Sequence, residues 1–204
     1  PAIPALAAAR LLSIPSLVHE QNGVLGRVNR FFAGRVARVA CGVWPVEGAP
    51  AGARLEHVGN PIRAAALAAR ARPYEAPGEG PLRLLVFGGS QGASALARLA
   101  PGAVALLPEA VRARLSVVQQ VREGEEGPVA EAYRSAGVAA ELAPFFEDMP
   151  GRIAAAHLVV ARAGASTVAE LAAIGRPAIL VPYPHAAADH QTLRRVDADV
   201  VESR

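Results

Sequence analysis

Apolar runs of strand length alternate with alanine-rich stretches of helical spacing from residue 81 onward. The runs are apolar almost throughout, which is typical of parallel strands covered on both faces. This half of the chain is therefore predicted to be α/β, with crossover helices on a parallel sheet. The predicted strands are 82–87, 115–121, 138–142, 157–161 and 178–181, and the predicted helices lie near 93–107, 128–136, 149–156, 167–174 and 189–195.

The first part of the chain shows fewer elements. The pattern predicts helices near 5–12 and 25–33 and strands at 16–19, 38–42 and 56–58. A Rossmann-like domain needs several βα units around its own sheet, so we expect the N-terminal domain to be incomplete. Residues 72–81 (RPYEAPGEGP) have the composition of a linker. The expected organisation is a partial domain at 1–71, a linker at 72–81 and a second domain at 82–204. The chain as a whole is expected to be truncated at both ends.

Composition narrows the possible chemistry. No uninterrupted apolar run reaches the length of a membrane span, so a cytosolic location is expected by default. Cys41 is the only cysteine, which excludes an internal disulfide framework, and we expect it to be buried and inert. All 21 basic residues are arginine, so a P-loop lysine and Schiff-base chemistry are also excluded.

The formal net charge of +3 raises the question of nucleic-acid binding. The arginines are scattered along the predicted helices, and aromatic residues make up only 4% of the chain. Nucleic-acid binding is therefore not expected.

The sharpest local pattern is GGSQGA (88–93), which follows a predicted strand and opens a helix. Glycines let the backbone approach an anion, and the N–H groups of a helix start favour a diphosphate. The spacing matches neither G-x-G-x-x-G nor a Walker motif. The alternative interpretation is a tight turn with Ser90 as the N-cap.

A second strand-to-helix turn is RAGASTVAE (162–170). Ser166 or Thr167 could cap the helix, with Glu170 at capping-box distance from Thr167. Alternatively, the Glu170 carboxylate accepts two hydrogen bonds from the vicinal hydroxyls of a ribose.

Polar residues also follow other predicted strands. VPYPH (181–185) and DHQ (189–191) come after the last strand, and HEQNG (19–23) comes after the first. Ligands of parallel sheets bind beyond the carboxyl ends of the strands, so these segments are candidate ligand walls. A capped helix start and an Asn-Gly turn are the alternatives. In GNPIR (59–63), Arg63 lies beyond a turn and is either a diphosphate ligand or an ordinary exposed arginine.

Together these segments resemble the MurG family, which transfers N-acetylglucosamine from UDP-GlcNAc to the membrane-anchored muramyl-pentapeptide intermediate of peptidoglycan. HEQNG, GNPIR, GGSQGA, FFEDM, RAGASTVAELAAIGRPAILVPYPH and DHQ occur in the order and approximate spacing of that family. The resemblance implies an α/β fold of the GT-B type, with two Rossmann-like domains that each contain a parallel sheet. The N-terminal one is incomplete here.

The resemblance implies a donor site held mainly by the C-terminal domain at the domain cleft. Gly89, Ser90 and Gln91 would bind the diphosphate region, with Arg63 nearby, and Phe146 would meet the uracil through its backbone. No metal and no cofactor are implied. The other implied contacts are Ala165, Ser166 and Thr167 on the nucleotide, Glu170 on the ribose, His190 and Gln191 at the sugar, and Asn22 across the cleft.

The chain also departs from the family pattern. A glycine-rich loop of the type GGTGGH is absent, and with it the histidine commonly proposed to act in catalysis, so His19 is the candidate base here. Ala163 stands where serine is frequent, and QQVR (119–122) replaces an HQTG-like strand exit.

The expected reaction is an inverting transfer in which an acceptor hydroxyl attacks the anomeric carbon while UDP leaves. The alternatives are a non-catalytic UDP-sugar-binding fragment and a UDP-GlcNAc epimerase of related fold. The expected partners are UDP-GlcNAc, the lipid-linked acceptor and the membrane surface. The resemblance places the protein in the cytoplasm, peripheral on the inner face of the bacterial cell membrane.

Overall fold

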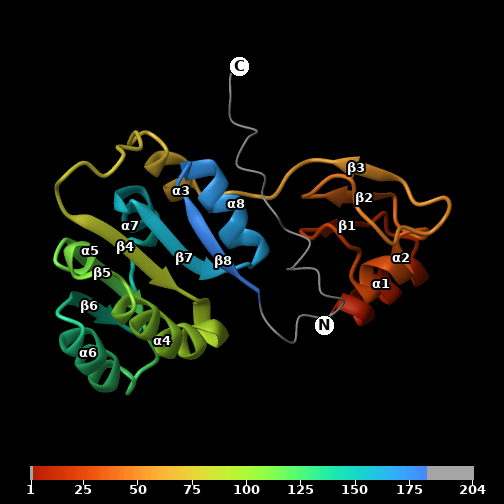
Figure 1. Cartoon of the computed structure of the whole chain (residues 1–204). Helices are drawn as coiled ribbons and strands as arrows, with labels where there is room; N and C mark the ends of the chain where they lie inside the picture. Colours follow the sequence, from red (N-terminus) through yellow and green to blue (C-terminus); the bar gives the residue numbers. More distant parts are fainter. Residues whose placement is uncertain (1, 183–204) are drawn as a thin grey trace. The chain divides into compact units, whose positions relative to one another are not determined.

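The computed structural model describes residues 2–182, with the backbone alone for 89–93. These residues form two compact units, unit 1 at 2–61 and unit 2 at 62–182. Figure 1 shows unit 1 in red to orange and unit 2 from gold to blue. Each unit contains its own parallel sheet, so the predicted α/β class is confirmed.

Unit 1 is built on a small parallel sheet of strand order β1-β2-β3. Val18 pairs with Val39, and Val39 pairs with Leu55. Cys41 lies in the core of this unit, as predicted, and burial raises the pKa of its thiol. The elements are α1 (Ala2–Leu11), β1 (Leu17–Glu20), α2 (Arg27–Phe32), β2 (Arg38–Cys41) and β3 (Leu55–His57).

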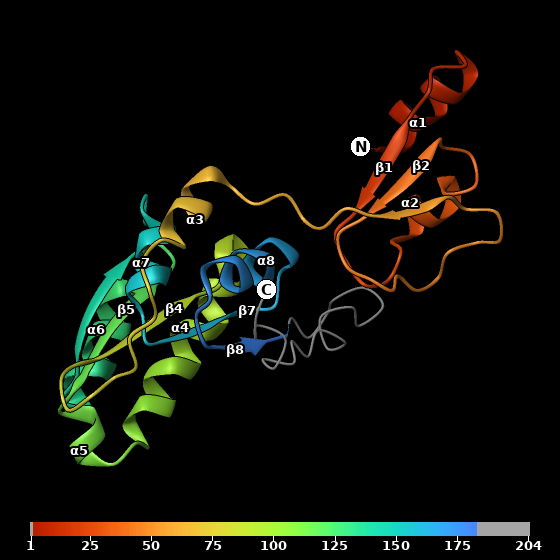
Figure 2. The same ribbon diagram turned by 90° about the horizontal axis from the view of Figure 1, so that it is seen from above.

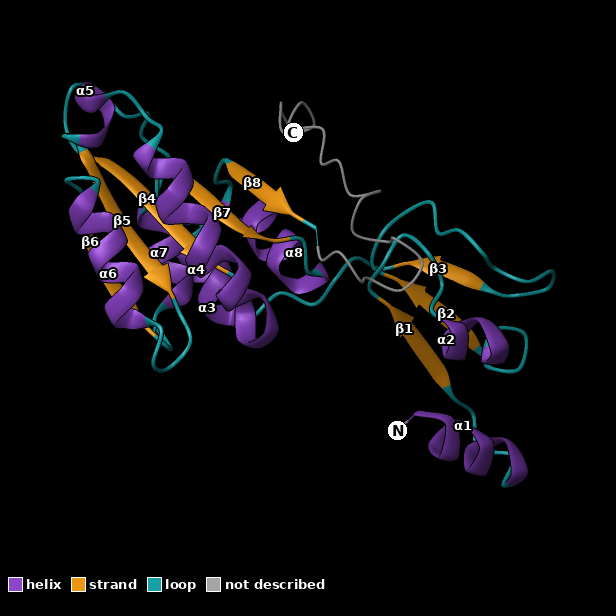
Figure 3. Ribbon diagram, turned by 60° about the horizontal axis from the view of Figure 1, so that its bottom comes forward, coloured by secondary structure: helices purple, strands orange, loops and turns teal. Residues whose placement is uncertain are grey.

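Unit 2 contains a five-stranded parallel sheet of order β6-β5-β4-β7-β8 (Figure 3). All five strands predicted in this half are present, and no bound differs from the prediction by more than one residue. The elements are α3 (Ala64–Ala69), β4 (Leu82–Phe87), α4 (Gly89–Ala105), α5 (Glu109–Arg112), β5 (Leu115–Gln120), α6 (Glu126–Ser135), β6 (Ala139–Ala143), α7 (Met149–Ala155), β7 (Leu158–Arg162), α8 (Ala165–Ile174) and β8 (Ala178–Val181).

The centre of the sheet of unit 2 is covered on both faces by helices, and neighbouring residues of its strands point to opposite sides. Leu85 packs with the cluster that includes residues of α3, α7 and α8. The next residue, Val86, packs with the cluster that includes residues of α4 and α6. The continuous apolar run of β4 thus supplies both cores, which explains why its sequence does not alternate.

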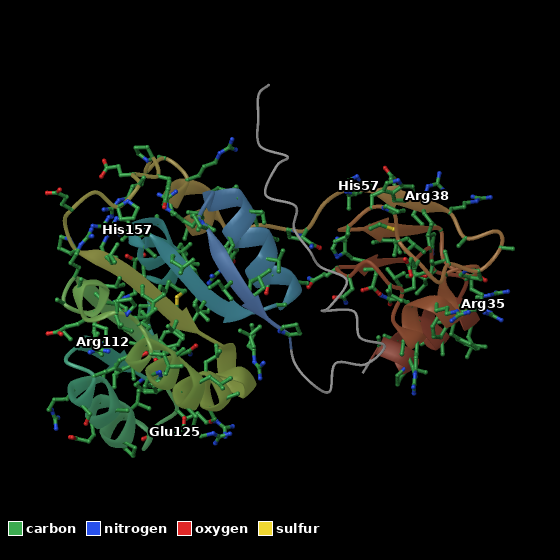
Figure 4. The ribbon with its side chains drawn as sticks, viewed as in Figure 1. Arg35, Arg38, His57, Arg112, Glu125 and His157 are labelled. Atoms are coloured by element: carbon green, nitrogen blue, oxygen red, sulfur yellow. The ribbon has the colours of Figure 1, made fainter. Side chains whose placement is uncertain are left out.

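Two short helices, α3 and α5, were not predicted. α3 packs against α7 and α8 through the buried Ala66, and Figures 1 and 2 both show these three helices side by side. Arg112 of α5 donates hydrogen bonds to the carbonyls of Ala105 and Leu107, each at 2.9 Å, and so satisfies the C-terminal end of α4 (Figure 4).

Because α3 packs against α7 and α8, it belongs to unit 2. The boundary between the two units therefore lies between Pro61 and Ile62, upstream of the predicted linker. Residues 72–81 therefore lie within unit 2 rather than between the units. The buried Arg176 guanidinium donates to the carbonyls of Arg72 (2.7 Å) and Pro73 (3.2 Å), and the Tyr74 hydroxyl donates to the carbonyl of His157 (3.4 Å). Residues 72–81 thus have the composition of a linker but form a surface segment that these hydrogen bonds hold to unit 2.

Two helix boundaries also differ from prediction. α4 begins at Gly89, four residues earlier than expected, and α8 begins at Ala165 rather than at Thr167. The helix predicted near 189–195 lies outside the described residues.

Candidate functional site

The strand order of unit 2 places a topological switch point between β4 and β7. These strands are neighbours, with Phe87 paired to Ala161 at their carboxyl ends. The chain leaves β4 through α4 toward β5 on one side, and leaves β7 through α8 toward β8 on the other. Open α/β sheets bind ligands at such points, because the two connections diverge there. Two of the predicted segments, GGSQGA and RAGASTVAE, meet at this edge.

Both helices at the switch point begin after a glycine. Gly88 is the N-cap of α4 and Gly164 is the N-cap of α8. The alternative that Ser90, Ser166 or Thr167 serves as N-cap is therefore wrong, because each of these residues lies within the first turn of its helix. Glycine has no side chain to accept the first-turn N–H groups, so these donors face a ligand more readily than in a side-chain-capped helix.

Glu170 pairs with Arg63 rather than forming a capping box with Thr167. Arg63 Nε donates to Glu170 Oε1 at 2.6 Å, and Arg63 Nη2 donates to Oε2 at 2.7 Å. The side chain of Glu170 is 11% exposed and that of Arg63 is 63% exposed, so the guanidinium covers the carboxylate from the solvent side. The hydrogen bond to Glu170 raises the pKa of Arg63 above its ordinary value. Two residues predicted to bind one nucleotide are thus brought together by the fold.

The position of this pair follows from local structure. Arg63 is the N-cap residue of α3, with extended backbone, and α3 is fixed by the packing of Ala66. Glu170 is in α8, where Leu171 and Ile174 are buried on the same cluster. The pair therefore lies where α3 meets α8.

Phe146 is buried beyond the carboxyl end of β6, also in unit 2. The Arg152 guanidinium lies over its ring, 4.1 Å from the centroid, and makes two hydrogen bonds to Glu141 at 2.8 and 2.9 Å. Asp148 is the N-cap of α7 and accepts a hydrogen bond from the backbone N–H of Gly151 at 3.1 Å. The FFEDM segment is thus a loop in which the Phe146 ring is buried under Arg152 and Asp148 caps the following helix.

The buried carboxylate of Glu20 organises the HEQNG loop of unit 1. It accepts hydrogen bonds from the backbone N–H groups of Asn22 (3.0 Å) and Gly26 (2.9 Å). It also accepts from the side-chain amides of Asn22 (2.9 Å) and Asn29 (3.0 Å). Burial acts to raise the pKa of Glu20, but these hydrogen bonds outweigh it and hold the pKa below its ordinary value. Asn22 is therefore held in place by the carboxylate of Glu20, which belongs to the same predicted HEQNG segment.

His19 joins the HEQNG loop to the GNPIR segment. Its Nε2 lies 3.1 Å from the carbonyl oxygen of Gly59. A carbonyl only accepts, so Nε2 carries the proton, and a neutral ring would accept a proton through Nδ1. Asn60 Nδ2 donates to the carbonyl of Gln21 at 3.2 Å and makes a second link between the same segments.

The remaining predicted residues lie at the starts of two helices or outside the described residues. Gly89, Ser90 and Gln91 form the first three residues of α4, and Ala165, Ser166 and Thr167 form those of α8. His190 and Gln191 lie outside the described residues. Among residues 2–182, no group of three or more His, Cys, Asp and Glu side chains is placed to hold a metal ion. Within that same range, every helix is too short or too polar to cross a membrane.

Comparison with known families gives two matches. Residues 83–198 match the Glycosyltransferase family 28 C-terminal domain, and residues 1–41 match the Glycosyltransferase family 28 N-terminal domain. The first match alone covers more than half of the chain. It includes the switch point and both helices that begin there.

Curated relatives share one name, UDP-N-acetylglucosamine--N-acetylmuramyl-(pentapeptide) pyrophosphoryl-undecaprenol N-acetylglucosamine transferase. The protein of Methylobacterium sp. (strain 4-46) is 56% identical over 188 residues, which are 90% of this chain and 50% of that protein. The protein of Brucella abortus (strain S19) is 52% identical over 187 residues, 91% of this chain and 49% of that protein. The chain therefore spans about half the length of these relatives.

A solved structure agrees with these sequence matches. The crystal structure of Acinetobacter baumannii MurG aligns with a TM-score of 0.73 and 34% identity, covering 94% of this chain and 52% of that one. The matches confirm the resemblance to MurG proteins and the GT-B class that it implied.

Proposed function

Because the chain belongs to glycosyltransferase family 28 and matches MurG proteins over nine-tenths of its length, we propose that it transfers N-acetylglucosamine from UDP-GlcNAc to a lipid-linked muramyl-pentapeptide. We also propose a division of labour in which unit 2 binds the donor and unit 1 serves the acceptor side. The observation that carries the proposal is the switch point of unit 2. The helices α4 and α8, each with a glycine N-cap, begin there, and α8 carries the carboxylate of Glu170.

The donor fits this site by its chemistry. A diphosphate suits the first-turn N–H groups of α4, where Gly89, Ser90 and Gln91 lie, and the cationic Arg63 adds a planar pair of donors. A ribose offers vicinal hydroxyls to Glu170, and the fixed loop at Phe146 offers backbone groups to the uracil.

The remaining donor-site assignments are also proposals. Residues 165–167 form the first turn of α8 and would pack against the nucleotide. His190 and Gln191 would reach the sugar, and unit 1 would supply Asn22, which Glu20 holds in position. None of these assignments involves a metal or a cofactor.

The chemistry follows from charge. As the acceptor hydroxyl attacks the anomeric carbon, the bond to the diphosphate breaks and UDP takes the electron pair. The negative charge that develops on the leaving diphosphate is stabilised by the helix N–H groups and by Arg63. A base must remove the hydroxyl proton, and in this chain the proposed group is Nδ1 of His19, because Nε2 is bound to Gly59.

The lipid-linked acceptor places the reaction at the inner face of the cell membrane, and unit 1 offers a surface that suits it. Leu11, Leu12 and Phe31 are exposed large apolar side chains on or beside α1 and α2. The Arg35 guanidinium lies 4.6 Å from the centroid of the Phe31 ring, and Figure 4 shows Arg35 beside α2. Exposed apolar side chains next to cations favour an anionic bilayer surface.

The test is the release of UDP from UDP-GlcNAc by the purified chain, with and without the lipid-linked muramyl-pentapeptide. Release that requires the acceptor, with N-acetylglucosamine appearing on the lipid, would support the proposal. Conversion of UDP-GlcNAc at the same rate without acceptor would indicate an epimerase instead. A folded chain that binds UDP-GlcNAc but produces neither result would contradict the proposed transfer by this chain.

A further inference from the structure

The arginine proposed for the diphosphate and the carboxylate proposed for the ribose bind each other directly in this structure. Both oxygens of Glu170 accept from the Arg63 fork, at 2.6 and 2.7 Å. This is the bidentate geometry in which guanidinium binds carboxylate most strongly. A nucleotide that used both residues as proposed would have to separate them first.

The burial of the two side chains is unequal, and this decides which of them must move. The Glu170 side chain is 11% exposed, and its helix is held by buried Leu171 and Ile174. The Arg63 side chain is 63% exposed and lies on the solvent side. The carboxylate is therefore a fixed group, and the guanidinium is a cover that can swing away.

We propose that Arg63 is a latch on the ribose site, which a nucleoside diphosphate opens by exchanging partners. The ribose hydroxyls take the place of the guanidinium on Glu170, and the released guanidinium binds the diphosphate. This inference rests on the proposed donor site. The guanidinium and the carboxylate would each exchange one partner for another, which keeps the exchange close to balanced for a diphosphate.

The latch makes the site selective for the phosphorylated form of its ligand. A nucleoside without phosphates has to separate Arg63 from Glu170 and offers the guanidinium nothing in return. A nucleoside diphosphate separates the same pair and supplies a new anionic partner. Arg63 would therefore weaken the binding of uridine while it strengthens the binding of UDP.

Because removal of Arg63 should strengthen uridine binding and weaken UDP binding, the two affinities provide a direct test. Uridine and UDP are titrated into the wild-type chain, Arg63→Gln and the control Arg134→Gln, with binding followed by NMR chemical shifts. Arg134 is matched to Arg63 because it also pairs with a glutamate of unit 2, Glu131, but on the surface of α6. Circular dichroism verifies that each variant is folded.

We expect Arg63→Gln to bind uridine about two- to five-fold more tightly, the range corresponding to a partly exposed ion pair. The same variant should bind UDP about ten-fold or more weakly, because a charge-assisted contact is lost. The control should change neither affinity. Uridine affinity that is unchanged or reduced in Arg63→Gln, while UDP still binds the wild type, would overturn the latch and leave the donor site standing. Absence of UDP binding to the folded wild type would overturn both.

A second measurement observes the latch without any substitution of Arg63. The Nε–H group of Arg63 should be slow to exchange with water in the free protein and should lose this protection when uridine is added. Glu170→Gln should remove the protection in the free protein. A fast-exchanging Arg63 Nε–H in the free wild type would contradict the proposal.

Discussion

Arg63 and Glu170 are 107 positions apart in the chain, yet the Arg63 guanidinium donates two hydrogen bonds to the Glu170 carboxylate. The contact exists because the short helix α3 packs on α8, and α3 begins directly after Arg63. One residue was assigned to a diphosphate and the other to a ribose on separate grounds. Their contact brings the two proposed ligand groups together where α3 packs on α8.

A buried carboxylate sets the stability of the HEQNG loop. Glu20→Gln puts an amide N–H group among four N–H donors, so we expect the free energy of unfolding of unit 1 to fall by about 2–4 kcal/mol at pH 7. The readout is urea unfolding followed by the fluorescence of Trp44, which belongs to unit 1 and is the only tryptophan in the chain. The control is Glu56→Gln, because Glu56 is an exposed carboxylate on β3.

The same carboxylate predicts a pH dependence with a definite sign. The pKa of Glu20 is lower in the folded protein than its ordinary value of 4.5. Its contribution to stability is therefore complete above about pH 4.5 and is lost as the pH falls through the folded-state pKa. The stability difference between wild type and Glu20→Gln should shrink as the pH is lowered through this range. A difference that grows on acidification would contradict the assignment.

Gly42 leaves room for Asn60, which links the HEQNG and GNPIR segments. A Cβ on Gly42 would lie 1.8 Å from Asn60 Oδ1, so Gly42→Ala must displace Asn60 and break its hydrogen bond to Gln21. We expect a loss of about 1–3 kcal/mol for unit 1, measured through Trp44. In an Asn60→Ala background the same substitution should have a smaller effect. Additive losses in the double variant would show that the two residues are not coupled.

Many elements were predictable because their signals are local. The strands of unit 2 appear as apolar runs, and β4 was placed with its observed bounds, Leu82–Phe87. The candidate sites at strand ends could be proposed from topology, since parallel strands bring their carboxyl ends to one edge. α3 was missed because AAALAA has no polar face to reveal its period, and α5 because it is a single turn.

Other features depend on contacts that no local pattern encodes. Residues 72–81 have the composition of a linker, but Arg176, more than 100 positions away, holds residues 72 and 73 to unit 2. The pairing of Arg63 with Glu170 likewise depends on tertiary packing. Glu20 was part of the predicted HEQNG segment, and its burial was predictable as well, because it follows Val18 at the two-residue period of the buried face of β1.

The role of Arg176 as a tether is testable by proteolysis. Its guanidinium also donates to the carbonyls of Ala154, Ile174 and Gly175. Arg176→Ala would leave these buried carbonyls unsatisfied, so we expect unit 2 to lose about 2–4 kcal/mol of unfolding free energy. Chymotrypsin should also cleave the variant at Tyr74 faster than the wild type.

A matched control for that experiment is Arg114→Ala. Arg114 is less buried than Arg176 and donates to the carbonyl of Gly80, which belongs to the same segment. Its hydrogen bonds to Gly80 lie at the exposed surface, where water can replace the guanidinium, so this change should affect stability by less than about 1 kcal/mol. Equal effects of the two substitutions would mean that burial of Arg176 is not what holds the segment.

The central claim is that unit 2 binds a uridine diphosphate sugar and that Glu170 contacts its ribose. The most direct measurement is calorimetric titration of the chain with UDP-GlcNAc, in wild type, Glu170→Ala and the control Glu131→Ala, whose carboxylate is exposed on α6. The account predicts binding of one ligand per chain, weakened about ten-fold or more by Glu170→Ala and unchanged in the control. A folded wild type that binds no UDP-GlcNAc, or a Glu170→Ala variant that binds it as tightly as the wild type, would contradict the account.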